Sequence, residues 1–269
     1  MQQLVLLLLI IICLPLKAQK ANFSLNPEEE QTLVQQKDST KVKKIEILNT
    51  DLFNFITTDT NTIRTFTGNV LFHHEGTDFY CNSAMQFMDT EIVVARGDVH
   101  IQKPDSFDIW ADYLVYYSKE KLAKFRGNVV FKDNSAKLLT DSLDFDLNTS
   151  IGNFWGGGTF ITDSSTLVSE RGVYYHKNKE AYFYEDVHLQ NPKFDLYSDS
   201  MQYNTETQIA YFISATKIVN ENDVIYTTSG SYDTKNNTAQ FDGRTNMTSG
   251  STRVEADSLY YNKEAGSVS

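Results

Sequence analysis

The chain has 269 residues and a formal net charge of −11, because 35 Asp and Glu residues outnumber 24 Lys and Arg residues. With 41% hydrophobic residues it is neither disordered nor membrane-integral, and its two cysteines exclude a disulfide scaffold. Its acidic balance disfavours binding to nucleic acid or to anionic membranes. The aromatic share of 13%, with 17 Phe and 15 Tyr, favours strands over helices.

The first segment is predicted to be an export signal. Residues 4–16 form an apolar run too short to cross a bilayer, which takes about 20 residues, and a small residue follows at Ala18. Cys13 lies inside this run behind Ile12, which is not small, so we do not expect it to carry a lipid. We therefore expect a signal peptide over residues 1–18, a flexible polar leader over residues 19–42, and export to the periplasm.

From residue 43 onward the sequence repeats at a nearly constant step. A Gly-Asn-Val or Gly-Asp-Val motif begins at Gly68, Gly97 and Gly127, which are 29 and 30 residues apart. A second motif, centred on Asp112 and Asp141, keeps the same step. Such a period indicates a repeat architecture. We expect about seven 29-residue units of two strands each, filling one domain over residues 43–269.

Each unit is predicted to contain two strands. The first strand alternates strictly, with Phe125 and Phe131 on one face. The second alternates through Trp110 and Leu114, and the Asp between them shares their face unless a bulge or a turn re-aims it; we favour a turn, since an unpaired buried carboxylate is costly. No helical pattern occurs in residues 60–262. The chain stops where another strand should begin, so we expect it to be a fragment.

Few residues have the spacing that catalysis or metal binding requires. His73 and His74 are adjacent, so on a strand they point to opposite faces and cannot chelate one ion; a solvated turn is the favoured explanation. The Asp column could supply the paired carboxylates of a glycosidase, but a structural turn or cap explains one Asp per unit. Gly156-Gly157-Gly158 is interpreted as a β-bulge and Cys81 as a small buried hydrophobe. We expect no enzymatic activity, no cofactor and no metal site.

Large apolar residues recur in step with both motifs. They stand four positions after the Gly column, two before the Asp column and two after it. The predicted inner surface consists of Phe72, Tyr80, Ile101, Trp110, Leu114, Phe131, Leu139, Leu143, Phe160, Leu189, Tyr197, Ile218 and Tyr226. Such a column fits an ordinary solenoid core, and it fits a lipid groove if the interior is wide or open along one edge.

The paired motifs resemble those of the OstA-like family, which includes the lipopolysaccharide-transport proteins LptA and LptC and the N-terminal domain of LptD. The resemblance covers roughly residues 45–269. Its motifs are Gly68-Asn69-Val70, Gly97-Asp98-Val99, Gly127-Asn128-Val129, Ala111-Asp112-Tyr113-Leu114, Thr140-Asp141-Ser142-Leu143 and Ala256-Asp257-Ser258-Leu259. Tyr80-Cys81-Asn82-Ser83-Ala84 resembles the Bacteroidetes-type subgroup. Glu185 and Ser214 replace the Gly, and Glu170 and Thr228 the Asp, in the middle units.

The resemblance implies an antiparallel β-jellyroll, or β-taco, whose apolar interior holds the acyl chains of lipopolysaccharide. It also implies partners at the edge strands, either other Lpt-type jellyroll proteins or an outer-membrane barrel. The leading hypothesis is thus a non-enzymatic, periplasmic lipid-binding component of lipopolysaccharide transport, associated with the outer membrane. The alternative is a solid-core β-solenoid that acts as a cell-envelope scaffold or adhesin, and a glycan-processing β-helix is a third possibility. An apolar cleft along the interior favours the transporter, and a closed core favours the scaffold.

Overall fold

The computed structural model describes residues 44–58, 61–262 and 267–268, which belong to one unit, Lys43–Ser269. The predicted signal peptide and leader lie outside the described residues. In the described part all regular structure is β-strand, in one sheet of 21 strands whose pairings are antiparallel. The predicted all-β antiparallel jellyroll is confirmed. None of the described residues belongs to a helix long and apolar enough to cross a membrane.

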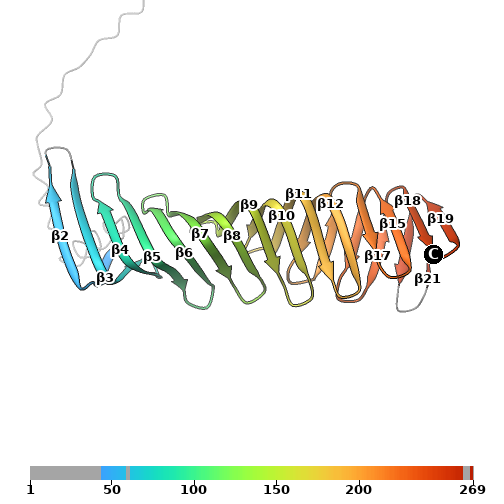
Figure 1. Cartoon of the computed structure of the whole chain (residues 1–269), viewed down its shortest axis with the longest axis horizontal. Helices are drawn as coiled ribbons and strands as arrows, with labels where there is room; N and C mark the ends of the chain where they lie inside the picture. The colour runs from blue at the N-terminus through green and yellow to red at the C-terminus, as the bar shows by residue number, and fades with distance from the viewer. Residues whose placement is uncertain (1–43, 59–60, 263–266, 269) are drawn as a thin grey trace, which may run out of the picture. The chain divides into compact units, whose positions relative to one another are not determined.

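The strands follow one another along the sheet in nearly the order of the chain (Figure 1). Their bounds are β1 (Glu46–Asn49), β2 (Leu52–Thr57), β3 (Thr62–His74), β4 (Thr77–Phe87), β5 (Ile92–Lys103), β6 (Phe107–Tyr117), β7 (Leu122–Lys132), β8 (Lys137–Asp146), β9 (Ile151–Ile161), β10 (Thr166–Tyr175), β11 (Glu180–Asn191), β12 (Phe194–Asn204), β13 (Ile209–Phe212), β14 (Thr216–Val219), β15 (Asp223–Thr227), β16 (Gly230–Asp233), β17 (Thr238–Phe241), β18 (Thr245–Ser249), β19 (Thr252–Ala256), β20 (Leu259–Asn262) and β21 (Ser267–Val268).

The sheet is folded lengthwise into two walls. Each strand from β3 to β12 runs through both walls and bends at a corner near its middle, where the pairing register shifts. Before β3 and after β12, two separate short strands replace each long strand, one in each wall. The first wall contains β1, β14, β15, β18 and β19, and the second contains β2, β13, β16, β17 and β20.

The corner is made by two residues of one strand that oppose one residue of the next. Between β3 and β4, Thr67 pairs with Ser83 and Val70 with Cys81, so that Gly68 and Asn69 face Asn82 alone. Gly68 and Asn69 have φ angles of 78° and 47°, in the left-handed region that glycine and asparagine tolerate best. This is the geometry of a β-bulge, which bends the strand and sharpens its twist.

The Asp column belongs to these corners, where a β-bulge inside the strand, and not the predicted turn, points the Asp side chain away from the interior. Asp112 is exposed, and its Oδ2 accepts a hydrogen bond from Asn128 Nδ2 at 2.7 Å. A Cβ at Gly127, where φ is +76°, would lie 2.7 Å from the same oxygen, so only glycine fits there. In the preceding corner the two residue types are exchanged, and Asn82 Nδ2 donates to Asp98 Oδ2 at 2.9 Å.

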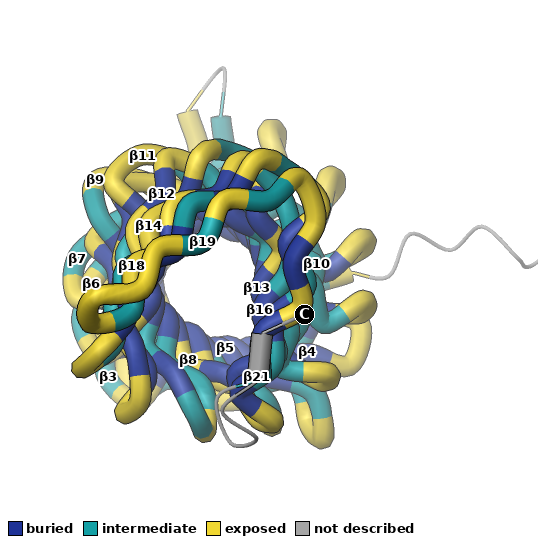
Figure 2. The backbone as a smooth tube through the Cα atoms, turned by 90° about the vertical axis from the view of Figure 1, so that its right-hand side faces the viewer, coloured by how far each residue is buried: buried dark blue, intermediate teal, exposed yellow. Residues whose placement is uncertain are grey.

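The buried side chains point into the space between the two walls. Seen along the row of strands, the backbone follows a ring whose inner side carries the buried residues (Figure 2). Side chains fill this space, and they form a single apolar cluster from Phe66 to Tyr261. Sheets that pack face to face stand about 10 Å apart, which leaves room for interdigitated side chains and little else.

Exchanging charge at one corner tests the Asp–Asn pairing. We expect Asn128→Asp to destabilise the protein by about 1 kcal/mol at low salt, because it sets two carboxylates against each other and removes a hydrogen bond. Adding Asp112→Asn should restore stability, since the double variant copies the native Asn82–Asp98 arrangement. Urea unfolding of the three proteins measures both effects. A double variant as unstable as the single one would show that the corner does not depend on this pair.

Candidate functional site

The interior contains eight of the predicted inner-surface residues. Each is at most 1% exposed, and each comes from the apolar face of its half-strand. They are Phe72, Ile101, Phe131, Phe160, Leu189 and Ile218 from the first wall and Leu114 and Leu143 from the second. Together they line the space between the walls from β3 to β14.

The other five predicted residues lie on the outer face of the first wall, which corrects the prediction. Trp110, Tyr197 and Tyr226 are 36%, 44% and 52% exposed. Tyr80 and Leu139 are partly exposed on the same face. The inward positions are one residue earlier, at Phe79, Ile109, Leu138, Leu196 and Ile225.

The cause of this error is the number of residues that each strand uses at the corner. Gly127 and Asn128 occupy the corner of β7, and two residues leave the alternation in phase, so that Phe125 and Phe131 both face inward. In β6 the corner takes one residue, Asp112, and the alternation inverts there.

Aromatic rings fill the middle of the interior. Phe107 and Phe145 have ring centroids 4.9 Å apart, and Phe131 stands 5.6 Å from Phe145 and 5.8 Å from Phe107. These separations are typical of favourable aromatic pairs in a packed core. In the described residues this region is therefore a closed core, and no open cleft separates these rings.

One side of the interior is closed by side chains rather than by a backbone ladder. There the turns that end the first wall face the turns that end the second wall, along a line that we call the seam. The first set comprises residues 74–77, 103–107, 132–137, 161–166, 191–194 and 219–223, and the second comprises 117–122, 146–151, 175–180, 204–209 and 233–238. Within the described residues no backbone hydrogen bond joins the two sets.

A column of buried tyrosines supports the seam from the second wall. These residues follow the repeat and are Tyr116, Tyr174, Tyr203, Tyr232 and Tyr261, with Phe145 at the remaining position. Tyr116 OH bonds His74 Nδ1 at 2.7 Å, and Tyr261 OH donates to Asp223 Oδ2 at 2.9 Å across the seam. Burial, with the nearby Asp223, raises the pKa of Tyr261 to about 12. Their 29-residue spacing was the signal that sequence reasoning missed.

The most extensive seam contact surrounds Asp133, whose side chain is fully buried. Its Oδ2 is 2.7 Å from His176 Nδ1 and accepts hydrogen bonds from Tyr174 OH at 2.8 Å and Lys179 Nζ at 3.1 Å. Its Oδ1 accepts from the backbone N–H of Ser135 at 2.7 Å. Burial alone would raise the pKa of Asp133, but these four partners outweigh it and hold that pKa well below its usual range.

Further hydrogen bonds continue the seam on both sides of this cluster. Ser106 Oγ is 3.2 Å from His176 Nε2, and Thr205 Oγ1 donates to Ser135 Oγ at 3.2 Å. Ser164 Oγ lies 3.3 Å from Thr234 Oγ1. The seam is thus a line of mostly polar side-chain contacts above an apolar core.

The remaining predicted residues have structural surroundings. His74 is 5% exposed at the end of β3, so the predicted solvated turn is wrong for it, because Tyr116 draws it into the seam. His73 pairs with Asp78 at 2.6 Å on the opposite face. Burial raises the pKa of the Cys81 thiol to about 12, which fits the predicted small hydrophobe. No group of three metal-binding side chains occurs in the described part of the chain.

The glycine run of the fourth unit is confirmed as a bulge. Gly156 and Gly157 have φ angles of 77° and 89°, and the pairing of β9 with β8 and with β10 shifts at this point. With glycine at the second corner position, Asp141 has no Asn opposite it, unlike Asp112. At the fourth corner the side-chain hydrogen bond comes instead from Thr140, whose Oγ1 donates to Gly157 O at 2.7 Å.

Comparison with known proteins gives two family matches. The profile of the OstA-like protein family matches residues 42–199, and that of the LptC-related lipopolysaccharide-assembly family matches residues 156–249. A similar solved structure is LptH from Pseudomonas aeruginosa, described as the LptA-homologous periplasmic component of the conserved lipopolysaccharide transport device. It is 16% identical, covers 39% of this chain and 80% of its own, and has a TM-score of 0.37. No curated protein matches the chain.

The Asp133 cluster predicts a dependence of stability on pH. The depressed pKa of Asp133 adds stability above the unfolded-state pKa of about 3.9, and this stability is lost as the pH falls through the folded-state value. Asp133→Asn should cost about 2 kcal/mol or more at pH 7, because Lys179 loses its buried counter-charge and His176 Nδ1 loses its carboxylate partner. Below about pH 5 the difference between the variant and the parent should shrink. Urea unfolding from pH 7 to pH 3 measures it, and a difference that does not vary with pH would contradict the assignment.

Proposed function

Because this chain belongs to the OstA-like protein family, we propose that it is a periplasmic lipid-binding component of lipopolysaccharide transport to the outer membrane. In this proposal residues 1–18 direct export, and the interior between the two walls holds the acyl chains of the lipid. The protein needs no catalytic residue or cofactor for this task, because burial of the acyl chains supplies the binding energy.

The observation that carries the proposal is that a continuous apolar interior is closed on one side by side chains alone. Each side-chain hydrogen bond of the seam contributes about 0.5–1.5 kcal/mol. Each acyl CH₂ group that leaves water gains about 0.8 kcal/mol, so a chain of about twelve such groups gains about 10 kcal/mol. Lipid binding can therefore offset the opening of several seam contacts, whereas it could not offset separation of the backbone ladders.

In the proposed cycle, lipid enters where the seam parts. The eight buried predicted residues, which include Phe131, then contact acyl chains. These contacts replace the ones that the side chains make with each other in the closed interior. The polar seam groups, including Asp133 and Lys179, remain at the rim, where the lipid's polar part leaves the interior. The cycle therefore requires the two walls to separate at the seam while the corners stay intact.

Partners are proposed at the strand edges. Among the described residues, β1 and β2 each pair only with β3, so each has a free edge. Leu52, Phe53 and Phe55 of β2 are 56%, 48% and 67% exposed. An exposed apolar edge strand is a template for strand addition. The proposed partners are other Lpt-type jellyroll proteins or an outer-membrane barrel.

A second candidate is the solid-core scaffold or adhesin, and the packed interior favours it. Phe131, Phe145 and Phe107 are each at most 2% exposed and contact one another. A scaffold would keep this packing permanently, whereas a carrier must loosen it. The two candidates therefore differ in whether lipid reaches the position of Phe131.

Photo-crosslinking separates the two candidates. A photoreactive aromatic residue at position 131 should capture lipopolysaccharide, because Phe131 points into the interior. The same residue at position 128 should not, because Asn128 lies exposed at the corner. Labelled lipopolysaccharide followed on a denaturing gel measures both. Equal capture at the two positions, or none at either in a folded protein, would favour the scaffold.

A reversible lock across the seam tests where lipid enters. Ser135→Cys with Thr205→Cys would join the two sides at a pair whose oxygens are 3.2 Å apart, in a chain whose own Cys13 and Cys81 are replaced by alanine. Oxidation should prevent lipid uptake, and reduction should restore it. The Cys-free chain under the same treatments is the control. Uptake that persists in the oxidised form would exclude the seam as the path.

A further inference from the structure

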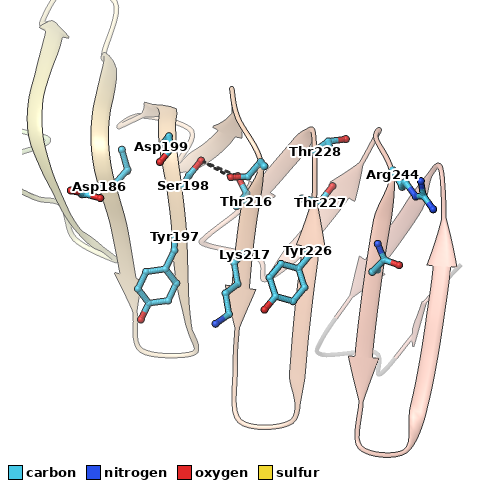
Figure 3. Close-up of a pocket in the computed structure, with 13 residues that line it drawn as sticks. Asp186, Tyr197, Ser198, Asp199, Thr216, Lys217, Tyr226, Thr227, Thr228 and Arg244 are labelled. Carbon is cyan, nitrogen blue, oxygen red and sulfur yellow. Dashed lines mark hydrogen bonds between the residues drawn. The ribbon is translucent and has the colours of Figure 1, made fainter.

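A pocket opens on the outer face of the first wall, away from the interior. Its volume is about 570 Å³, within the range of about 300–1,000 Å³ that small-molecule sites occupy. Tyr197, Lys217 and Tyr226 stand in a row on neighbouring strands, and Asp199 and Arg244 lie beside the corner above them (Figure 3). We propose that this pocket, with the outer stripe that continues it, binds a linear polysaccharide.

The two aromatic rings of the pocket each contact a neighbouring side chain. Tyr197 stacks on His188 with centroids 4.5 Å apart and planes 7° from parallel, and His188 Nε2 is fixed by Asp195 Oδ1 at 2.8 Å. Lys217 Nζ lies 5.9 Å from the centroid of the Tyr226 ring. Both tyrosines remain about half exposed. Half-exposed aromatic rings are suited to stack against the apolar face of a sugar ring.

The charged groups of the pocket are not neutralised by partners of opposite charge within the described residues. Among the described residues, Asp186, Asp199, Lys217 and Arg244 form no ion pair or hydrogen bond with another side chain. Two acids and two bases give the pocket no net charge, in a chain whose net charge is −11. Planar carboxylate and guanidinium groups beside aromatic rings offer the paired donors and acceptors that sugar hydroxyl groups require.

These features favour a sugar chain over other polymers. The backbone groups of β12, β14, β15 and β18 are paired on both sides, so a peptide could not add a strand here. A nucleic acid would be repelled by the net negative charge of the protein. A second copy of this acidic chain would be repelled for the same reason. A neutral saccharide meets none of these penalties.

The spacing of the stripe favours a linear chain over a compact saccharide. The outward position that holds Tyr197 and Tyr226 recurs on every second strand, at Trp110, Leu139 and Val168, and alternate strands lie about 9.6 Å apart. That repeat is close to the length of a disaccharide. Two further hollows follow the same side of the corner, one beside Tyr80 and one beside Leu139. A polysaccharide lying across the strands would meet an apolar side chain at each step, which is aromatic at Trp110, Tyr197 and Tyr226 and aliphatic at Leu139 and Val168.

Binding of a soluble hexamer of β-1,4-linked N-acetylglucosamine to the full chain, measured by calorimetry, tests the proposal. Tyr226→Ala and Tyr197→Ala should each weaken binding by about tenfold. Tyr211→Ala is the matched control, because Tyr211 is 40% exposed on β13 in the second wall, outside the pocket. An Arg244→Gln variant should also weaken binding, since it removes a charged donor without altering the core.

Three results would overturn the proposal. They are no binding of the hexamer by the parent protein, an equal loss in Tyr211→Ala, and tighter binding of the saccharide released from deacylated lipopolysaccharide than of the hexamer. The last result would assign the pocket to the saccharide of the transported lipid rather than to a linear glycan. Lipid capture at position 131 is measured in parallel and should be unchanged in Tyr226→Ala, so the pocket and the interior are tested separately.

Discussion

The structure depends on one mismatch in strand pairing, in which two residues of one strand oppose a single residue of the next. Gly127 and Asn128 facing Asp112 illustrate it. The mismatch bends every long strand at the same level, and a continuous sheet thereby becomes two facing walls. The corner of each strand lies beside the corner of the neighbouring strand. The backbone hydrogen bonds between these strands therefore hold the bend along the whole row. The apolar interior is a consequence of this bend, because the bend turns the apolar faces of the two walls toward each other.

The same construction makes the two sides of the interior unequal. The corner side is closed by continuous backbone, whereas the seam side is closed by side chains such as Asp133, Tyr174 and Lys179. Breaking the seam exposes polar groups that water can solvate, and breaking the corner would expose unpaired backbone. A protein that must admit a large apolar ligand without unfolding gains from this asymmetry. The buried carboxylate gives the closed state a defined geometry, because it orders partners from several turns around one point.

Much of the fold could be predicted from the sequence, because the 29-residue step repeats residues whose backbone conformations are restricted. Glycine at position 127 and the alternation of Phe125 with Phe131 identify both the corner and the inner face of β7. The inner face of β6 was misjudged at Trp110, since alternation can be extended through a corner only if the number of residues in the corner is known. The seam was not foreseen at all. Asp133 and His176 are 43 positions apart, and no local pattern connects them.

The Asp and the Asn of the corner pair swap positions from one corner to the next, and this alternation affects which strands can pair. A chain of similar units can misfold by pairing a strand with the equivalent strand one unit further on. In the native arrangement Asp51 receives a hydrogen bond from Asn69 at 2.9 Å. A displacement by one unit would bring Asp51 opposite Asp98, which is another carboxylate. The alternation of Asp and Asn at the corners thus disfavours this misaligned pairing relative to the native one.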